Sequence, residues 1–177
     1  MENTLNEEFL YRATKEVLLE VKSEAVDCLK SLHESENIVT NKANGLLQVL
    51  FPVFVAIFGY IVIQLPNKKF DTILIIACLQ EIVIFLSCYF LFDILVSRKT
   101  ALLGSSPEKL FQERIVNKEK EENYIELLRL RVFGLNNAIK VATATNRVRT
   151  VLLFKALNFL MIGTSAVIIF FFLTLLV

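Results

Sequence analysis

Two neighbouring polar residues, Gln80 and Glu81, lie inside an apolar stretch that is long enough to cross a bilayer. The stretch covers residues 72–96 and contains Asp93 near its end. A carboxylate in the middle of a membrane costs roughly 3 kcal/mol even on lenient insertion scales, and it marks a pathway, a partner or a buried interface. Glu81 therefore predicts polar chemistry at membrane depth.

A second set of polar residues lies in the last apolar stretch, residues 151–177. Lys155 and Asn158 recur there with Ile162 and Ser165 at helical spacing, so the four share one face. We interpret Gln80, Glu81 and Asp93 as candidate lining groups of a polar path, and Lys155 and Asn158 as their candidate partners. Three readings stay open: a dry interface in which Glu81 pairs with Gln or Lys, an aqueous pore, or a proton relay.

Enzyme chemistry finds little support in the sequence. His33 is the single histidine, and no glycine-rich phosphate loop, GxSxG or HExxH motif occurs. The three cysteines form no CxxC pair. We therefore expect no metal, no cofactor and no enzyme activity.

One spacing invites a nuclease reading, because helical RNases of the HEPN type place an Arg and a His four to six residues apart. Arg131 fits the first position, but Asn136 or Asn137 stands where the His belongs. Asn cannot shuttle a proton at neutral pH, so general acid/base cleavage of RNA is disfavoured. Arg131 and Asn136 are better explained as polar groups on a helix surface.

Composition sets the class of protein. The 177 residues are 55% hydrophobic, which excludes an ordinary soluble domain, yet 21% are charged, which excludes a bare bundle of spans. Three segments are long and apolar enough to span a membrane: 46–65, 72–96 and 151–177. The first two form a predicted transmembrane hairpin over 46–96. The fold class is therefore an all-α membrane protein with about three spans.

The two polar regions, residues 1–45 and 97–149, both show helical periodicity. The apolar stripe of the first is Phe9, Ala13, Val17, Val21, Ala25, Leu29 and Leu32; that of the second is Tyr124, Leu128, Leu135, Ile139 and Ala142. Residues 1–45 carry five Lys/Arg against nine Asp/Glu, net −4, and residues 97–149 carry eleven against six, net +5. Such complementary regions can pair within one chain or between neighbouring chains.

Cations indicate the orientation. Lys42, Arg98, Lys99, Arg147 and Arg149 flank the spans on one side, whereas the short link offers Lys68 and Lys69. The more cationic side is predicted to be cytoplasmic. Both polar regions then lie in the cytoplasm with the N-terminus, and no break punctuates the pattern from Tyr124 into the third span.

The layout, with its degenerate Arg131/Asn136 patch, resembles the small membrane accessory proteins of type VI-B, RNA-targeting CRISPR loci. More loosely, it is similar to SLATT-type membrane effectors of bacterial anti-phage systems. The resemblance implies a homo-oligomeric inner-membrane channel, an antiviral defence effector that permeabilises or depolarises the cell.

The same resemblance implies an RNA-guided CRISPR effector as the activating partner, without direct nucleic-acid binding by this chain. Arg131 and Asn136 would be vestiges of a HEPN-like fold. Two alternatives remain: a non-conducting membrane anchor or scaffold for a soluble partner, and a membrane-tethered HEPN-type RNase.

Overall fold

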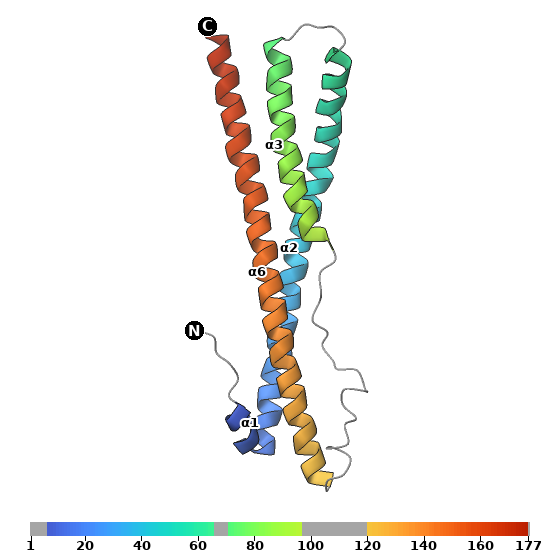
Figure 1. Cartoon of the computed structure of the whole chain (residues 1–177), viewed down its shortest axis with the longest axis vertical. Coiled ribbons are helices and arrows are strands. Elements are labelled where there is room, and N and C mark those ends of the chain that lie inside the picture. The colour runs from blue at the N-terminus through green and yellow to red at the C-terminus, as the bar shows by residue number, and fades with distance from the viewer. Residues whose placement is uncertain (1–6, 66–70, 97–119, 177) are drawn as a thin grey trace. The chain divides into compact units, whose positions relative to one another are not determined.

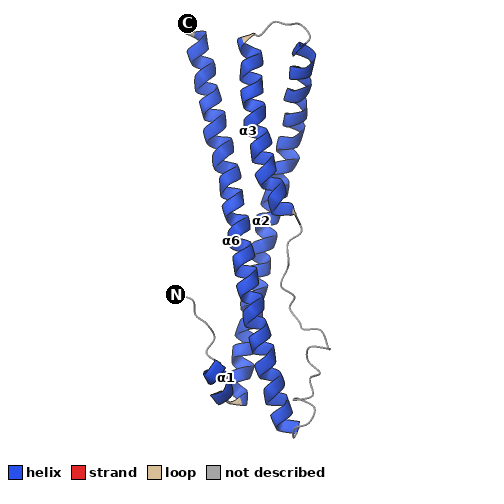
Figure 2. Ribbon diagram, in the orientation of Figure 1, coloured by secondary structure: helices blue, strands red, loops and turns tan. Residues whose placement is uncertain are grey.

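The computed structural model describes residues 7–65, 71–96 and 120–176, and 96% of them are helical (Figures 1 and 2). The four helices are α1 (Glu7–Arg12), α2 (Lys15–Gln64), α3 (Thr72–Leu95) and α6 (Lys120–Leu175). Helices α2, α3 and α6 are each long and apolar enough to cross a membrane, which confirms the predicted all-helical class and its three apolar segments. The predicted region 97–149 lies outside the described residues as far as residue 119.

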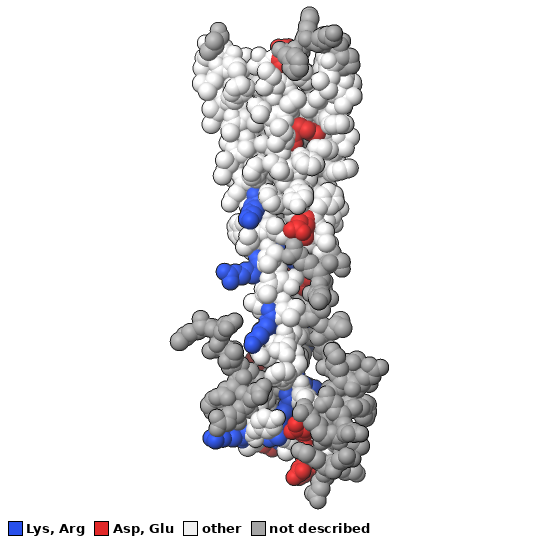
Figure 3. Space-filling view, in the orientation of Figure 1, with Lys and Arg blue, Asp and Glu red and all other residues white. Residues whose placement is uncertain are grey.

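The chain divides into two compact units. The polar unit comprises Met1–Glu36 and Arg98–Asn146, and the membrane unit comprises Asn37–Ser97 and Arg147–Val177. Both α2 and α6 contribute residues to each unit. Figure 3 shows that the visible surface of the membrane unit carries few charged side chains.

Helix α2 is continuous through the predicted boundary at residues 45 and 46. Asn44 and Gly45 are typical of a helix end, but residues 41–51 contain no proline and helical periodicity continues on both sides, so backbone hydrogen bonding runs through them. Pro52 lies inside the helix although it has no N–H to donate to the carbonyl of Gln48. Helix α6 is likewise unbroken from Lys120 to Leu175, as the pattern after Tyr124 predicts.

Helix α2 begins after a short interruption of the N-terminal helical pattern. The N–H of Leu18 donates to the carbonyl of Thr14 at 3.0 Å, which closes the first turn. The pKa of the Glu16 carboxyl lies below its usual value, first because its own backbone N–H hydrogen-bonds it and then because the Thr14 side chain does. Thr14 and Glu16 therefore stabilise the start of α2.

The polar unit is held by two apolar clusters between the N-terminal helices and α6. Leu10 and Leu18 pack with Leu128 and Val132 in the first, and the second is formed by Leu29, Leu135 and Ala142. Within this unit the two polar regions thus pair inside one chain.

Part of the predicted N-terminal stripe is wrong. Val17 and Val21 are 48% and 40% exposed, whereas Leu18, outside the predicted stripe, is buried. The reason is the step size: each four-residue step advances about 40° around an α-helix, so a stripe that runs back from Leu29 to Val17 within α2 drifts off the buried face. The side chain of Phe9 lies outside the described part of the structure.

Arg129 ties α1 to α6. Its Nε and Nη2 donate to the carbonyls of Leu10 and Tyr11 at 3.0 and 2.8 Å, and its Nη1 lies 3.2 Å from the buried Glu126 carboxylate. The guanidinium also lies 5.1 Å from the centre of the Tyr11 ring. A cation at these last carbonyls of α1 satisfies groups that a helix end leaves unpaired.

The membrane unit has a core built from all three spanning helices. The buried members come from α2 (Ala43, Leu47, Leu50), α3 (Ile84, Cys88, Leu91, Ile94) and α6 (Leu153, Ala156). Next to this core, Gly163 of α6 faces Val83 of α3 so closely that an added Cβ would lie 2.7 Å from both Val83 methyl carbons. Small residues that let helices approach are the typical packing device of membrane bundles.

We expect Arg129→Ala to free α1, because the change removes three charge-assisted contacts and leaves the buried Glu126 carboxylate without this cation. A loss of about 2 kcal/mol of local stability corresponds to a roughly 30-fold larger equilibrium constant for the opening of α1, and so to roughly 30-fold faster amide exchange. Hydrogen–deuterium exchange of a peptide covering residues 7–14 measures this opening. Arg131→Ala, at an exposed position of the same helix, is the control and should leave the exchange unchanged; equal effects of the two variants would contradict the role of Arg129.

We also expect Gly163→Ala to lower the free energy of unfolding by about 1–3 kcal/mol, because the β-branched Val83 side chain cannot rotate away. Thermal unfolding in detergent, followed by circular dichroism, checks this. Gly59→Ala is the matched control in a spanning helix, since an added Cβ there meets nothing within 4 Å. The idea fails if both variants lose the same stability, or if Val83→Ala does not partly restore the Gly163→Ala protein.

Candidate functional site

Glu81 is the unusual group of the membrane unit. Its side chain is buried, with 9% exposed, and neither carboxylate oxygen has a hydrogen-bond partner among the described residues. It lies nine residues into α3, about 14 Å along the axis, which is close to the middle of a hydrocarbon layer about 30 Å thick. The carboxyl group is therefore buried within its own bundle, on a helix that is long and apolar enough to cross a membrane.

The position of Glu81 on α3 explains its burial. Leu74, Glu81 and Cys88 follow each other at steps of seven residues and are all buried. Residues seven apart lie two turns apart on nearly the same side of a helix. Glu81 thus occupies a core position of α3 at which an apolar residue would pack without a desolvation cost.

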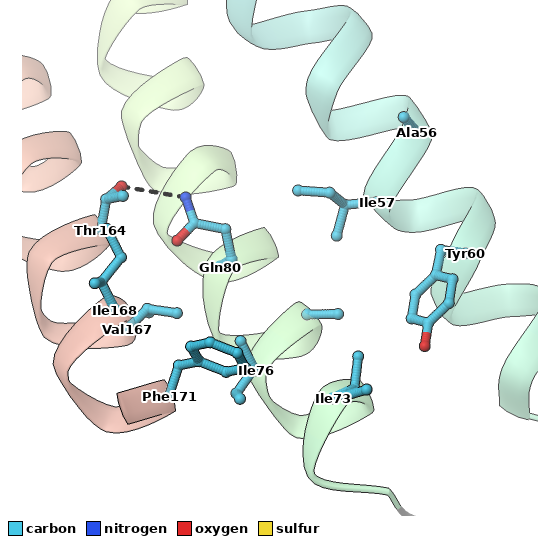
Figure 4. Close-up of a pocket in the computed structure, with 11 residues that line it drawn as sticks. Ala56, Ile57, Tyr60, Ile73, Ile76, Gln80, Thr164, Val167, Ile168 and Phe171 are labelled. Atoms are coloured by element: carbon cyan, nitrogen blue, oxygen red, sulfur yellow. Dashed lines mark hydrogen bonds between the residues drawn. The ribbon is translucent and has the colours of Figure 1, made fainter. Parts of the chain in front are cut away.

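Gln80 makes the polar link that sequence reasoning did not identify. Its Nε2 donates to the Thr164 Oγ1 at 3.1 Å, joining α3 to α6 (Figure 4). Thr164 neighbours Gly163 in the sequence, so the hydrogen bond and the close helix contact occur at the same level. The adjacent small and hydroxyl residues of α6 were the available sequence signal.

Gln80 and Thr164 also border an apolar groove between the three spanning helices. Its volume is about 570 Å³. The lining residues are Ala56, Ile57, Tyr60, Ile73, Ile76, Ala77, Gln80, Thr164, Val167, Ile168 and Phe171 (Figure 4). Tyr60 supplies the one titratable side chain of this lining, so the groove offers apolar packing rather than acid/base chemistry.

The other predicted site residues are spread over different surfaces. Lys155 and Asn158 are exposed on α6, and Asp93 is half-buried on α3. Since both Glu81 oxygens lack a partner among the described residues, neither Lys155 nor Asn158 pairs with it. The structure brings Gln80 to α6, but it does not gather the five predicted residues into one site.

Arg131 and Asn136 also lie apart. Arg131 is exposed and Asn136 is half-buried. Five residues along an α-helix correspond to a rotation of about 140°, so the two side chains leave α6 in different directions. This placement does not bring the Arg131 and Asn136 side chains together at one phosphodiester bond, as an RNase active site would require.

Two further buried polar residues follow the same seven-residue spacing as the apolar core. In the polar unit, the Glu36 carboxylate lies 3.5 Å from Nδ1 of His33. In the membrane unit, Arg149 is buried and its Nη1 donates to Thr40 Oγ1 at 3.3 Å. Within the part of the chain that the structure describes, no group of three His, Cys, Asp or Glu residues can hold a metal ion.

Compared with protein-family models, with curated proteins and with solved structures, the chain shows no match.

We expect Glu81→Leu to raise the free energy of unfolding by about 1–3 kcal/mol, because it removes a buried carboxyl group without a partner. Gln80→Leu is the matched variant one residue earlier. It should lower the free energy of unfolding by about 1 kcal/mol, because it removes the hydrogen bond to Thr164. Unfolding in detergent at pH 7 compares the two. A loss of stability in Glu81→Leu would show that the carboxylate is engaged in a favourable interaction.

Proposed function

We propose that the chain is the subunit of a homo-oligomeric pore in a bacterial inner membrane, with one face of α6 turned toward the path. We call this face the α6 membrane seam: Lys155, Asn158, Ile162 and Ser165. The observation that carries the proposal is that all four side chains are exposed. Two of them, Asn158 and Ser165, carry an amide and a hydroxyl within a segment apolar enough to span a membrane.

The α6 membrane seam lies opposite the packed face of α6. Asn158 is two residues beyond the buried Ala156, and Ser165 is two residues beyond Gly163, which faces Val83. Two residues correspond to a rotation of about 200° around an α-helix. The seam therefore points away from α2 and α3 of its own chain.

Lipid tails offer no hydrogen bonds to such a face, so association with like faces is favoured. A ring of chains that turns this face inward would place Asn158 and Ser165 along an aqueous path and the Lys155 side chains in a ring near one mouth. Rings of Lys favour anions. We therefore assign Lys155 to ion selection and Asn158 and Ser165 to the wet wall of the path.

The biological setting belongs to the same proposal. The pore would act as an antiviral defence effector, opened when a nucleic-acid-sensing partner such as an RNA-guided CRISPR effector reports infection. The cation distribution supports a cytoplasmic polar unit and N-terminus, where such a partner is accessible. Pores that open only on a signal would leave the uninfected cell polarised.

Purified protein in liposomes tests the pore. We expect wild-type protein to dissipate an ion gradient and the double variant Asn158→Leu/Ser165→Leu to reduce the flux at least tenfold while keeping its oligomeric mass in detergent. Lys155→Glu should shift the reversal potential toward cation selectivity. Met161→Leu, at an exposed position on the edge of the seam, keeps an apolar side chain of similar size, so it is the matched control and should conduct normally.

Two outcomes would contradict the assignment. Absence of conductance in an assembled wild-type protein would favour the non-conducting anchor. Flux lost in Glu81→Leu but retained in the double seam variant would move the path away from this face of α6 and toward the interior of the bundle.

A further inference from the structure

We infer that α2 and α6 carry two complementary outer faces through which copies of this chain assemble head to tail. The acidic seam of α2 is Glu20, Glu24, Asp27, Ser31 and Glu34. The mixed seam of α6 is Phe133, Asn137, Lys140, Ala144 and Arg147. All ten side chains are exposed. The inference deepens the proposed pore and rests on it, since it names the contact that the assembly would use.

The acidic seam lies on the side of α2 opposite its buried face. Glu20 is two residues beyond the buried Leu18, and Asp27 is two residues before the buried Leu29, again a rotation of about 200°. Asp27 pairs within its own chain with the exposed Lys30 at 3.1 Å, an ion pair of little energetic weight. The face thus keeps an acidic character after the chain has folded.

A surface groove accompanies the acidic seam. It is lined by Glu20, Val21, Glu24, Ala25 and Cys28 and has a volume of about 550 Å³. Val21 and Ala25 give it an apolar floor, and the two glutamates supply carboxylates. A partner that fits it brings an apolar side chain together with a cation.

The mixed seam of α6 offers such a pair. Phe133 is 42% exposed, and Lys140 follows seven residues later on the same side of the helix. Phe133 is two residues before the buried Leu135, so this seam also lies opposite the packed face. Arg147 continues the spacing directly after the polar unit ends.

The two seams match in register. Each member of the α6 seam comes 113 positions after the corresponding member of the acidic seam, with the same alternation of four-residue and three-residue steps. Within one chain, Asn146 donates to the carbonyl of Leu32 at 2.7 Å, a sequence separation of 114. Positions separated by about this number therefore lie near one level of the polar unit, to within roughly one helical turn of about 5.4 Å.

Copies in one membrane share orientation and depth when the symmetry axis is normal to the bilayer, so positions of equal level meet. The register then brings Lys140 close to Asp27 and Phe133 close to the groove beside Glu20. Within each chain the two seams point away from the shared core. The contact is therefore heterologous, and repeating it about an axis normal to the bilayer gives a ring where the rotation per copy closes.

Thiol cross-linking in inside-out membrane vesicles tests the contact with the full chain. Cys28 is exposed and borders the groove, and Val141, 113 residues later, is also exposed. Each follows a seam residue directly, so the two side chains leave parallel facing helices at opposite edges of the contact, and a cross-linker with a long spacer is needed to join them. We expect Val141→Cys, treated with such a membrane-impermeant thiol cross-linker, to give a ladder of dimers, trimers and larger species. Wild-type protein should not pass beyond dimer, and Arg131→Cys, about 200° around α6 from Phe133, should give no ladder.

Charge reversal then tests the complementarity. Lys140→Glu and Asp27→Lys, each added to Val141→Cys, should cut the ladder at least tenfold, and the two reversals together should restore it. Dimers alone would overturn the head-to-tail contact in favour of a two-fold one. Monomers alone would overturn it as well. Ladders indifferent to charge reversal would overturn the seam pairing.

The failure of this inference and that of the proposed pore are separable. A ladder in vesicles that do not conduct leaves the contact standing and removes the pore. Conducting vesicles without a ladder remove the contact and leave the pore.

Discussion

Burial in this chain recurs every seven residues, and the packing of each unit depends on that period. On α6 it selects Leu128, Leu135 and Ala142 in the polar unit and Arg149 and Ala156 in the membrane unit. Because 3.6 residues make a turn, a strict seven-residue repeat keeps one narrow face toward the neighbouring helix over many turns. The same repeat can drive helix packing in water and in lipid. In water it buries apolar surface, and in lipid it brings small side chains into close contact.

Polar residues interrupt this repeat on every long helix. Glu36 on α2, Glu81 on α3 and Arg149 on α6 each occupy a position that the repeat assigns to the core. Two of the three have nearby polar groups: Glu36 lies near His33, and Arg149 contacts Thr40. A polar group at a core position disfavours helix registers that would leave it unpaired, at a cost in stability. Glu81 has no hydrogen-bond partner among the described residues, so its burial costs stability and no hydrogen bond within its own chain offsets that cost.

The spanning segments could be predicted from the sequence because length and apolar content alone demand helices in a membrane. The phase of the N-terminal stripe could not, since Val17, Leu18 and Leu19 are all apolar and the pattern does not show which of them faces the core. Glu81 could be recognised as costly from its neighbours in the sequence, but its lack of a partner depends on which side of α6 Lys155 occupies. The link from Gln80 to Thr164 depends on the relative level of two helices, which spacing within one segment does not contain.

The continuity of α2 and α6 has a mechanical consequence. Within each unit, a helical segment without a joint resists torsion, so a small rotation imposed on part of it is not absorbed by a loop. Such a rod yields first where its backbone bonding is incomplete. In α2 that place is Pro52, which leaves the Gln48 carbonyl without its helical donor. Compliance in α2 is thus concentrated within its apolar segment.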